Sequence, residues 1–273
     1  MVTLPPGTPP ADDAPHNHRE LAESFGSDAD KYDRARPRYP APLIGAIGDR
    51  LPGPTVLDVG IGTGISSEPL RQRGLSVLGV EPDPDMAALA RAKDFSVETG
   101  RFEDWDPAGR TFDGVIAGQT WHWIDPDAGA SKAASVLRPS GQIALFWNLG
   151  LPSPELAAEF AEVFASLDTG LPFNPWAAAP RADPYGSIID RAGAGLRATG
   201  AFGPVERLAF AWQSTIGRDA WLERASTSGG INRLPQDKLD TLLRGMGTAI
   251  DAVGGTLLID HTTVAALAER LPD

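Results

Sequence analysis

The stretch that decides the fold is Val56-Leu57-Asp58-Val59-Gly60-Ile61-Gly62-Thr63-Gly64, in which an apolar run meets three alternating glycines. Glycine accepts positive φ angles and lets a ligand approach the backbone closely. In an open parallel sheet, ligands bind at the carboxyl ends of the strands. The stretch therefore predicts a buried strand over Thr55–Val59 that leads into a ligand-binding glycine turn.

Short apolar runs and helical stretches alternate from this strand to residue 147. The pattern predicts further strands at Ser76–Glu81, Phe95–Thr99, Phe112–Ala117 and Gln142–Trp147. It predicts helices between them near Ser67–Arg73, Pro84–Lys93 and Pro126–Leu137, with Asp83 as the N-cap of the second. This alternation indicates an α/β protein with a doubly wound, mostly parallel sheet and helices on both faces.

The segments outside this core differ in composition. Residues 1–24 are rich in proline at their start and are predicted to form a flexible N-terminal arm. Helices are predicted from Ser27 or Asp28 to Ala35 and from Pro42 to about Arg50. In the second half, Ser153-Pro154-Glu155 opens a helix, residues 208–212 suggest a strand, residues 239–250 an amphipathic helix and Thr256–Thr263 a final strand. Residues 169–200 have no clear pattern.

Charge and cysteine content exclude several functions. The 273 residues include 36 Asp and Glu against 24 Lys and Arg, and the net charge of −12 argues against nucleic-acid and anionic-membrane partners. With no cysteine, the chain has no disulfide, thiolate metal site, iron–sulfur cluster or cysteine nucleophile. No secretory pattern and no membrane-length apolar run is visible, so the expected location is the cytoplasm.

The details of the glycine turn discriminate between nucleotide-binding families. The dinucleotide fingerprint G-x-G-x-x-G/A would place Gly or Ala at position 65, where this chain has Ile65. The acidic residue Asp58 followed by Gly60, Gly62 and Gly64 instead resembles the first motif of class I S-adenosylmethionine-dependent methyltransferases. That resemblance implies a Rossmann-like, seven-stranded sheet whose last strand is antiparallel.

Further segments agree with this family in order and spacing. Gly79-Val80-Glu81-Pro82-Asp83 and Gly100-Arg101-Phe102-Glu103-Asp104 resemble its second and third motifs. The resemblance implies that Glu81 binds both ribose hydroxyls, that Phe102 offers its backbone N–H to the adenine and that Glu103 accepts from the adenine amine. Residues 112–117 and 138–142 resemble its fourth strand and the turn into its fifth.

The segment Tyr32-Asp33-Arg34-Ala35-Arg36-Pro37-Arg38-Tyr39-Pro40 resembles the subgroup of small-molecule, type-11-like methyltransferases. In that subgroup the segment folds over S-adenosylmethionine, so Arg36 would pair with the methionine carboxylate and Tyr32 would line the pocket. The alternative is that the arginines are solvated surface charges. The predicted cofactor contacts are Tyr32, Arg36, Asp58, Gly60, Ile61, Gly62, Gly64, Glu81, Pro82, Phe102, Glu103 and Gln119. Asp58 alternatively only braces the glycine turn.

The run Trp121-His122-Trp123 follows the fourth strand and is expected at the ligand edge of the sheet. His122 is the candidate catalytic residue, because an imidazole can accept the proton of a methyl acceptor. The alternative is that His122 and Trp123 only pack the start of the next helix. The predicted substrate contacts are Trp121, Trp123, Trp147 and Asn148. No metal site is predicted.

The resemblance implies that residues 25–273 form one methyltransferase domain, with a helical substrate lid inserted within residues 149–235. The predicted function is in-line transfer of a methyl group to an O, N or C atom of a small organic molecule by a monomer or homodimer. An NAD(P)-dependent oxidoreductase and a non-catalytic S-adenosylmethionine-binding protein remain as alternatives. Neither a cysteine nucleophile nor an Asn/Asp-Pro-Pro-aromatic motif after the fourth strand is present, which argues against nucleic-acid methylation.

Overall fold

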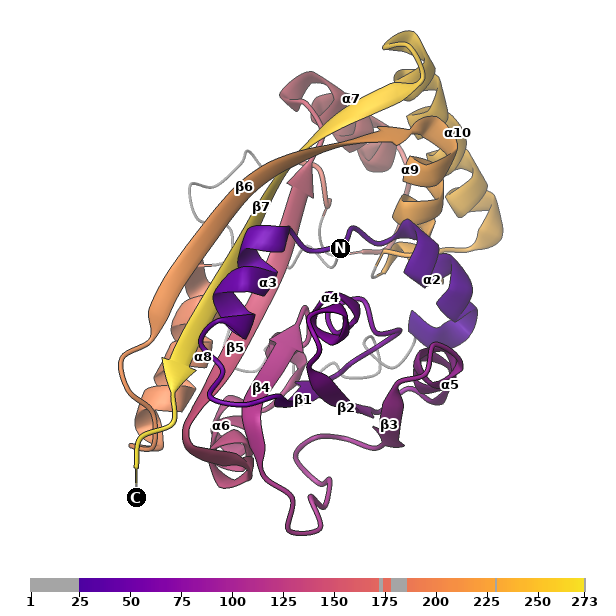
Figure 1. Cartoon of the computed structure of the whole chain (residues 1–273). Helices are drawn as coiled ribbons and strands as arrows, with labels where there is room; N and C mark the ends of the chain where they lie inside the picture. Colours follow the sequence, from indigo (N-terminus) through magenta and orange to yellow (C-terminus); the bar gives the residue numbers. More distant parts are fainter. Residues whose placement is uncertain (1–24, 172–173, 178–185, 229, 273) are drawn as a thin grey trace.

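A computed structural model describes residues 25–171, 174–177, 186–228 and 230–272 (Figure 1). The predicted N-terminal arm, residues 1–24, therefore lies outside the described residues. Within them, a twisted sheet forms the centre of the molecule, and helices cover both of its faces (Figure 1).

The sheet has seven strands in the order β3-β2-β1-β4-β5-β7-β6. Their bounds are β1 Thr55–Val59, β2 Ser76–Glu81, β3 Ser96–Thr99, β4 Phe112–Gly118, β5 Leu137–Leu151, β6 Glu206–Gly217 and β7 Thr256–Glu269. The first five strands pair in parallel, whereas β7 is antiparallel to both β5 and β6. The predicted Rossmann-like sheet with an antiparallel last strand is confirmed. Chain order reverses beside β1, between β2 and β4, and this reversal places a ligand edge at the end of β1.

The helices fall into two groups on the faces of the sheet and a third beyond its end. Their bounds are α2 Ala29–Ala35, α3 Ala41–Gly48, α4 Glu68–Gln72, α5 Pro84–Ala92, α6 Pro126–Val136, α7 Pro154–Ala165, α8 Gly186–Ala198, α9 Arg218–Ser226 and α10 Gln236–Ala252, with short 3-10 helices η3 Phe25–Asp28, η4 Trp121–Trp123 and η5 Ile231–Arg233. Asp83 caps α5 as predicted, because its carboxylate accepts from the backbone N–H groups of Asp85 and Met86.

Side-chain alternation along the strands builds two separate apolar layers. Val56 and Ile116 pack with α3 and α4 on one face, whereas the neighbouring Leu57 and Val115 pack with α6 and α8 on the other. Successive residues of a strand point to opposite faces, so strands covered on both sides are apolar at nearly every position. This is why the strands could be recognised as continuous apolar runs.

The strands on the antiparallel side are longer than the sequence predicts. β5 runs to Leu151, beyond the predicted end at Trp147, and β7 runs to Glu269, beyond Thr263. Ten residues of β5, Gln142–Leu151, pair with β7, and twelve of β6 pair with β7. The partner strands, which lie far away in the sequence, supply the hydrogen bonds that extend each strand.

The extended ends of these strands carry a second apolar core. It contains Phe160 and Phe164 of α7, Trp221 of α9, Met246 of α10 and Ile259 of β7, together with Leu156, Ala225, Ile231, Leu234, Leu242, Ile250 and Leu257. We call these twelve residues the apical cluster, since α7, α9 and α10 lie beyond the end of the sheet (Figure 1). The cluster includes α10, which follows the predicted lid boundary at residue 235. No helix among the described residues combines the length and apolar character needed to cross a bilayer.

Candidate functional site

A cavity opens at the carboxyl ends of β1, β2 and β4, where the sheet order reverses. It is lined by predicted cofactor residues from five segments, namely Tyr32, Arg36, Gly60, Ile61, Gly62, Glu81, Pro82, Phe102, Glu103 and Gln119. Of the other predicted residues, His122, Trp123 and Asn148 also line it. The fold therefore gathers thirteen of the seventeen predicted site residues around one space, and Asp58, Gly64, Trp121 and Trp147 lie outside that lining.

The glycine turn owes its shape to backbone angles and to one close contact. Gly60, Gly62 and Gly64 have φ angles of +67°, +57° and +89°, which side chains rarely allow. The N–H of Gly60 donates to the carbonyl of Val80 at 2.8 Å, so the turn is tied to β2. A Cβ atom on Gly60 would lie 2.2 Å from Cγ2 of Thr120. Only glycine fits between this turn and the end of β4.

Asp58 and Gly64 support the turn from beneath. The Asp58 carboxylate is fully buried and accepts from the hydroxyls of Ser66 and Ser67, both at 2.6 Å. Burial raises the pKa of this carboxyl to about 6. At Gly64, a Cβ atom would lie 2.6 Å from the ring of Phe95. Asp58 therefore holds the start of the following segment through the hydroxyls of Ser66 and Ser67.

Glu81 presents a carboxylate that backbone groups hold in place. Its Oε2 accepts from the N–H of Gly62 at 2.8 Å, and its Oε1 accepts from the N–H of Asp83 at 3.0 Å. Burial is the largest cause that raises the pKa of this carboxyl, to about 7, while the two backbone bonds oppose the rise. Each carboxylate oxygen has further acceptor capacity. The group is suited to receive hydroxyl donors from a ligand.

Arg36 contributes a buried guanidinium to the cavity lining. Its Nη2 donates to the carbonyl of Thr227 at 2.7 Å, and its Cζ lies 4.6 Å from the centroid of the Tyr32 ring. Its Nε and Nη1 are buried without a hydrogen-bond partner among the described residues. Burial, and then the charge of Arg224, lowers the pKa of Arg36 to about 9. Two N–H donors on a buried cation leave room for an anionic ligand group.

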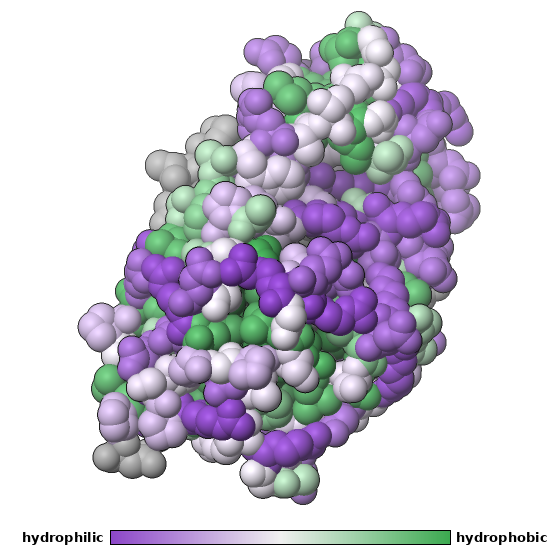
Figure 2. All heavy atoms as spheres, in the orientation of Figure 1, coloured by the Kyte–Doolittle hydropathy of each residue, from purple (hydrophilic) through white to green (hydrophobic). Residues whose placement is uncertain are grey.

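The helix that carries Arg36 is fastened to the glycine turn. The Asp33 carboxylate accepts from the Thr63 hydroxyl at 2.6 Å and pairs with Lys93, also at 2.6 Å. Arg38 reaches the same carboxylate at 3.2 Å, and these bonds hold the pKa of Asp33 below its usual value against the opposing effect of burial. Hydrophilic residues cover the side of the molecule where α2 and α5 lie (Figure 2). Polar contacts thus hold α2, whose Tyr32 lines the cavity, against the glycine turn.

The predicted adenine segment lies between the cavity and the core. The Phe102 ring is buried, 6.3 Å from the Trp121 ring, and residues 101–103 line the cavity. Glu103 accepts from the N–H of Asp125 at 3.2 Å, which ties the segment to the start of α6. Opposite it, Gln119 has a φ of +59° and donates from its side chain to the carbonyl of Asn148 at 2.8 Å.

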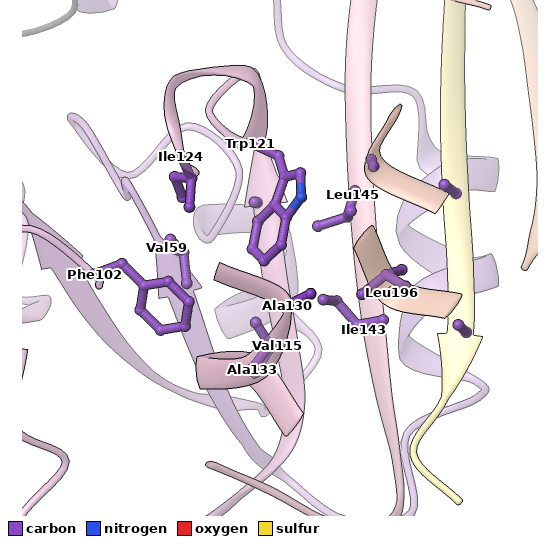
Figure 3. Close-up of a cluster of buried hydrophobic side chains, with 14 of the residues drawn as sticks. Val59, Phe102, Val115, Trp121, Ile124, Ala130, Ala133, Ile143, Leu145 and Leu196 are labelled. Carbon is purple, nitrogen blue, oxygen red and sulfur yellow. The ribbon is translucent and has the colours of Figure 1, made fainter. Parts of the chain in front are cut away.

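The aromatic run after β4 divides between the cavity and the core. Trp121 is 2% exposed and packs among Ala130, Leu145 and Leu196 (Figure 3). Trp147 is fully buried in the same layer. Neither side chain lines the cavity, because both indoles pack in the apolar layer that contains residues of α6 and α8. The sequence analysis predicted both tryptophans as substrate contacts. The sequence pattern does not indicate which face of the sheet each side chain joins.

Twelve further residues line the cavity that the sequence analysis did not select, among them Tyr39, Met86 and Arg101. Tyr39 packs edge-on against Phe146, with ring centroids 4.8 Å apart. Tyr39 and Arg101 both fall inside the quoted motif segments, so a signal for them was available, whereas Met86 looks like an ordinary core residue of α5. Among the described residues, no group of three or more His, Asp or Glu side chains is placed to hold a metal ion.

Comparisons with known proteins agree with this arrangement. A family model described as a methyltransferase domain matches residues 57–145. An uncharacterized methyltransferase of Mycobacterium bovis is 38% identical over 136 residues, which cover 48% of this chain and 55% of that protein. A ubiquinone biosynthesis O-methyltransferase of Methylobacterium is 34% identical over 100 residues, which cover 33% and 39%. The chain spans about half the length of the first of these curated relatives.

Solved structures extend the likeness beyond the matched domain. A candidate type II methyltransferase from Anaeromyxobacter dehalogenans superposes with a TM-score of 0.60 at 23% identity, over 87% of this chain and 99% of the other. A phosphoethanolamine N-methyltransferase of Haemonchus contortus superposes with a TM-score of 0.51 at 16% identity, over 94% and 60%. These likenesses concern the fold. Residues 57–145 thus match a methyltransferase domain, and the fold of the chain is similar to that of these solved structures.

Proposed function

We propose that this protein is an S-adenosylmethionine-dependent methyltransferase that transfers a methyl group by in-line displacement to an O, N or C atom of a small organic molecule. The observation that carries the proposal is the Glu81 carboxylate, held by the N–H groups of Gly62 and Asp83 at the rim of the cavity. Vicinal ribose hydroxyls are donors that such a carboxylate can accept together.

A second feature of the cavity, the buried guanidinium of Arg36, fits the methionine part of this cofactor. Arg36 has two buried N–H groups without a partner among the described residues, and a carboxylate is the group that a guanidinium binds best. Glu81 would therefore hold the ribose and Arg36 the methionine carboxylate. Phe102 and Glu103 would hold the adenine between them, and Ile61, Pro82 and Gln119 would line the remaining walls.

The chain's part in the reaction is alignment and exclusion of water. When bound, S-adenosylmethionine supplies an electrophilic methyl group on a positively charged sulfur. Displacement at such a carbon gains most from holding the reactants in line in a closed site. The α2 helix, fastened by Asp33 to Thr63 and Lys93, would close the site above the cofactor.

The acceptor would enter between Trp123, Asn148 and the segments that follow β5. Trp123 and Asn148 line the cavity, and Asn148 is fixed by Nδ2, which donates to the carbonyl of Arg38 at 3.3 Å. The apical cluster lies beyond this edge of the sheet. We place the choice of acceptor in these residues and in the predicted insertion within residues 149–235, all in one domain that extends from residue 25 to residue 273.

Calorimetric titration tests the proposal directly. S-Adenosylmethionine and its demethylated product should each bind with a stoichiometry of one, and NADPH should not bind. A screen of small carboxylates, phenols and amines with methyl-labelled cofactor should then identify acceptors. If NADPH binds tightly and S-adenosylmethionine does not, the proposal is wrong. Binding without methyl transfer to any screened molecule would favour the non-catalytic alternative.

A further inference from the structure

The tautomer of His122 is determined by its neighbour in β5. His122 lies in η4, directly after β4, and its Nδ1 accepts from the indole N–H of Trp147 at 3.2 Å. Trp147 is fully buried, so this donor is enclosed by the core. An indole nitrogen is a donor only. The Nδ1 atom of His122 must therefore offer a lone pair and cannot itself carry a proton.

The remaining nitrogen then carries the proton of the neutral ring. A neutral imidazole has one N–H, and with Nδ1 occupied as an acceptor the proton lies on Nε2. Burial lowers the pKa of His122 to about 3, so the ring is neutral at every ordinary working pH. Besides His122, the titratable side chains that line the cavity are Tyr32, Arg36, Tyr39, Glu81, Arg101 and Glu103, and Glu103 accepts from the backbone N–H of Asp125.

The Nε2–H group lacks a partner in the protein. His122 lines the cavity, and its Nε2 is buried without a hydrogen-bond partner among the described residues. Buried polar groups in folded proteins are nearly always paired, and an exception at a ligand cavity points to a bound molecule as the missing partner. A donor at this position requires a lone pair on that molecule.

We propose that His122 acts as a fixed Nε2–H donor that positions the methyl acceptor through an oxygen lone pair, and that it does not accept the acceptor's proton. The acceptor is then an oxygen-bearing small molecule whose methyl-accepting atom needs no base from the enzyme, such as a carboxylate or an ionised phenol. This reverses the proton-accepting role that the sequence suggested for His122. The identification of the molecule bound to His122 as the methyl acceptor rests on the proposed function, whereas the assignment of the tautomer does not.

Long-range ¹H–¹⁵N correlation spectra of the ¹⁵N-labelled full chain test the tautomer. The chain has four histidines, and a His122→Gln variant assigns the signal of His122. We expect a neutral ring with the proton on Nε2, unchanged between pH 5 and pH 9. The Trp147→Phe variant should lose this preference and show both tautomers. A proton on Nδ1, or an imidazolium signal in this range, would overturn the proposal whether or not the protein methylates anything.

Steady-state kinetics with an acceptor found in the screen distinguish whether His122 acts as a hydrogen-bond donor or as a base. Glutamine keeps an N–H donor but is no base, so His122→Gln should stay within about threefold of the parent kcat/KM, whereas His122→Ala should lose roughly 10- to 100-fold. Equal losses of kcat/KM in both variants, with an inflection in the pH profile of the parent enzyme, would show that His122 acts as a base. Calorimetry with the demethylated cofactor, expected to be unchanged in both variants, keeps this result distinct from a failure of cofactor binding.

Discussion

The glycine-turn edge of the sheet and the apical cluster are held together by different interactions. At the edge, backbone and carboxylate groups bond over short sequence distances, as in Gly62 to Glu81 and Ser66 to Asp58. In the apical cluster, Phe160 and Trp221 stack with centroids 5.7 Å apart, although α7 and α9 are far apart in the chain. Polar groups define the first region, and apolar packing defines the second.

The difference teaches where specificity and stability reside. A site made from neighbouring loop backbones tolerates almost no change of shape, because each hydrogen bond depends on a particular φ angle. An apolar cluster tolerates changes of equal volume but suffers from lost volume. Substitutions in the two regions should therefore have different effects. Those at the glycine-turn edge should change cofactor affinity, and those in the apical cluster should change the free energy of unfolding.

The largest effect is expected in the apical cluster. Phe160→Ala removes a fully buried ring that packs against both Trp176 and Trp221, so the free energy of unfolding should fall by about 3–5 kcal/mol. Urea denaturation followed by tryptophan fluorescence measures this loss. The matched control is Leu258→Ala at a position that is 54% exposed, which should change little. A large loss of cofactor affinity in folded Phe160→Ala would show that the two regions are coupled.

The next effect is expected at the glycine turn. Gly60→Ala forces a Cβ atom to within 2.2 Å of the Thr120 side chain, and the affinity for the demethylated cofactor should fall about 100-fold, or ~2.8 kcal/mol. Gly74→Ala is the control, because Gly74 has a similar φ of +88° but open space around its Cβ position. Calorimetry should find normal affinity in that control. Equal losses in both variants would mean that backbone strain alone, without the clash, determines binding.

A smaller loss should follow from removing the buried cation. Arg36→Met keeps the apolar stem but deletes the two N–H donors without partners, and we expect the demethylated cofactor to bind about 10- to 50-fold more weakly. Arg34→Met is the matched control, because Arg34 is exposed and paired with Glu223. If both variants bind normally, Arg36 does not hold the methionine carboxylate.

The smallest effect concerns pH. The pKa of Glu81 is raised to about 7 in the protein without ligand, and ribose hydroxyls bind the ionised form. Binding should therefore release a proton, and affinity should fall about tenfold as the pH drops from 8 to 6. Glu81→Gln should bind weakly at both pH values. A slope that persists in this variant would instead point to Asp58, whose pKa is about 6.

Parts of the fold and site were predictable because their causes lie within a few residues. The strands Thr55–Val59 and Ser76–Glu81 have the predicted bounds, since apolar runs bounded by Gly and Pro leave little choice. Glu81 was predictable from its place between a strand and a capped helix. Helix α8 was not predicted, because residues 169–200 are rich in Gly, Pro and Ala, and the buried apolar side chains described in this helix are only Ile189, Ala192 and Leu196.

The aromatic run Trp121-His122-Trp123 shows most clearly where prediction from the sequence ends. The sequence placed Trp121, His122 and Trp123 together at the ligand edge, and the structure leaves two of them at the cavity while Trp121 enters the core. Which side each ring takes depends on the direction of the chain after β4 and on the space left by α6 and α8. Neither quantity is encoded in the run itself.

The sequence by itself determined the order of strands and helices between residues 55 and 147, the glycine turn and the carboxylate at the end of β2. Each of these follows from local backbone preference and from the alternation of apolar residues. Only the tertiary structure decided that Arg36 is a buried cation, that Trp147 sets the tautomer of His122 and that three separate helices form the apical cluster. These features depend on contacts between distant segments, where burial and pairing change what a side chain can do.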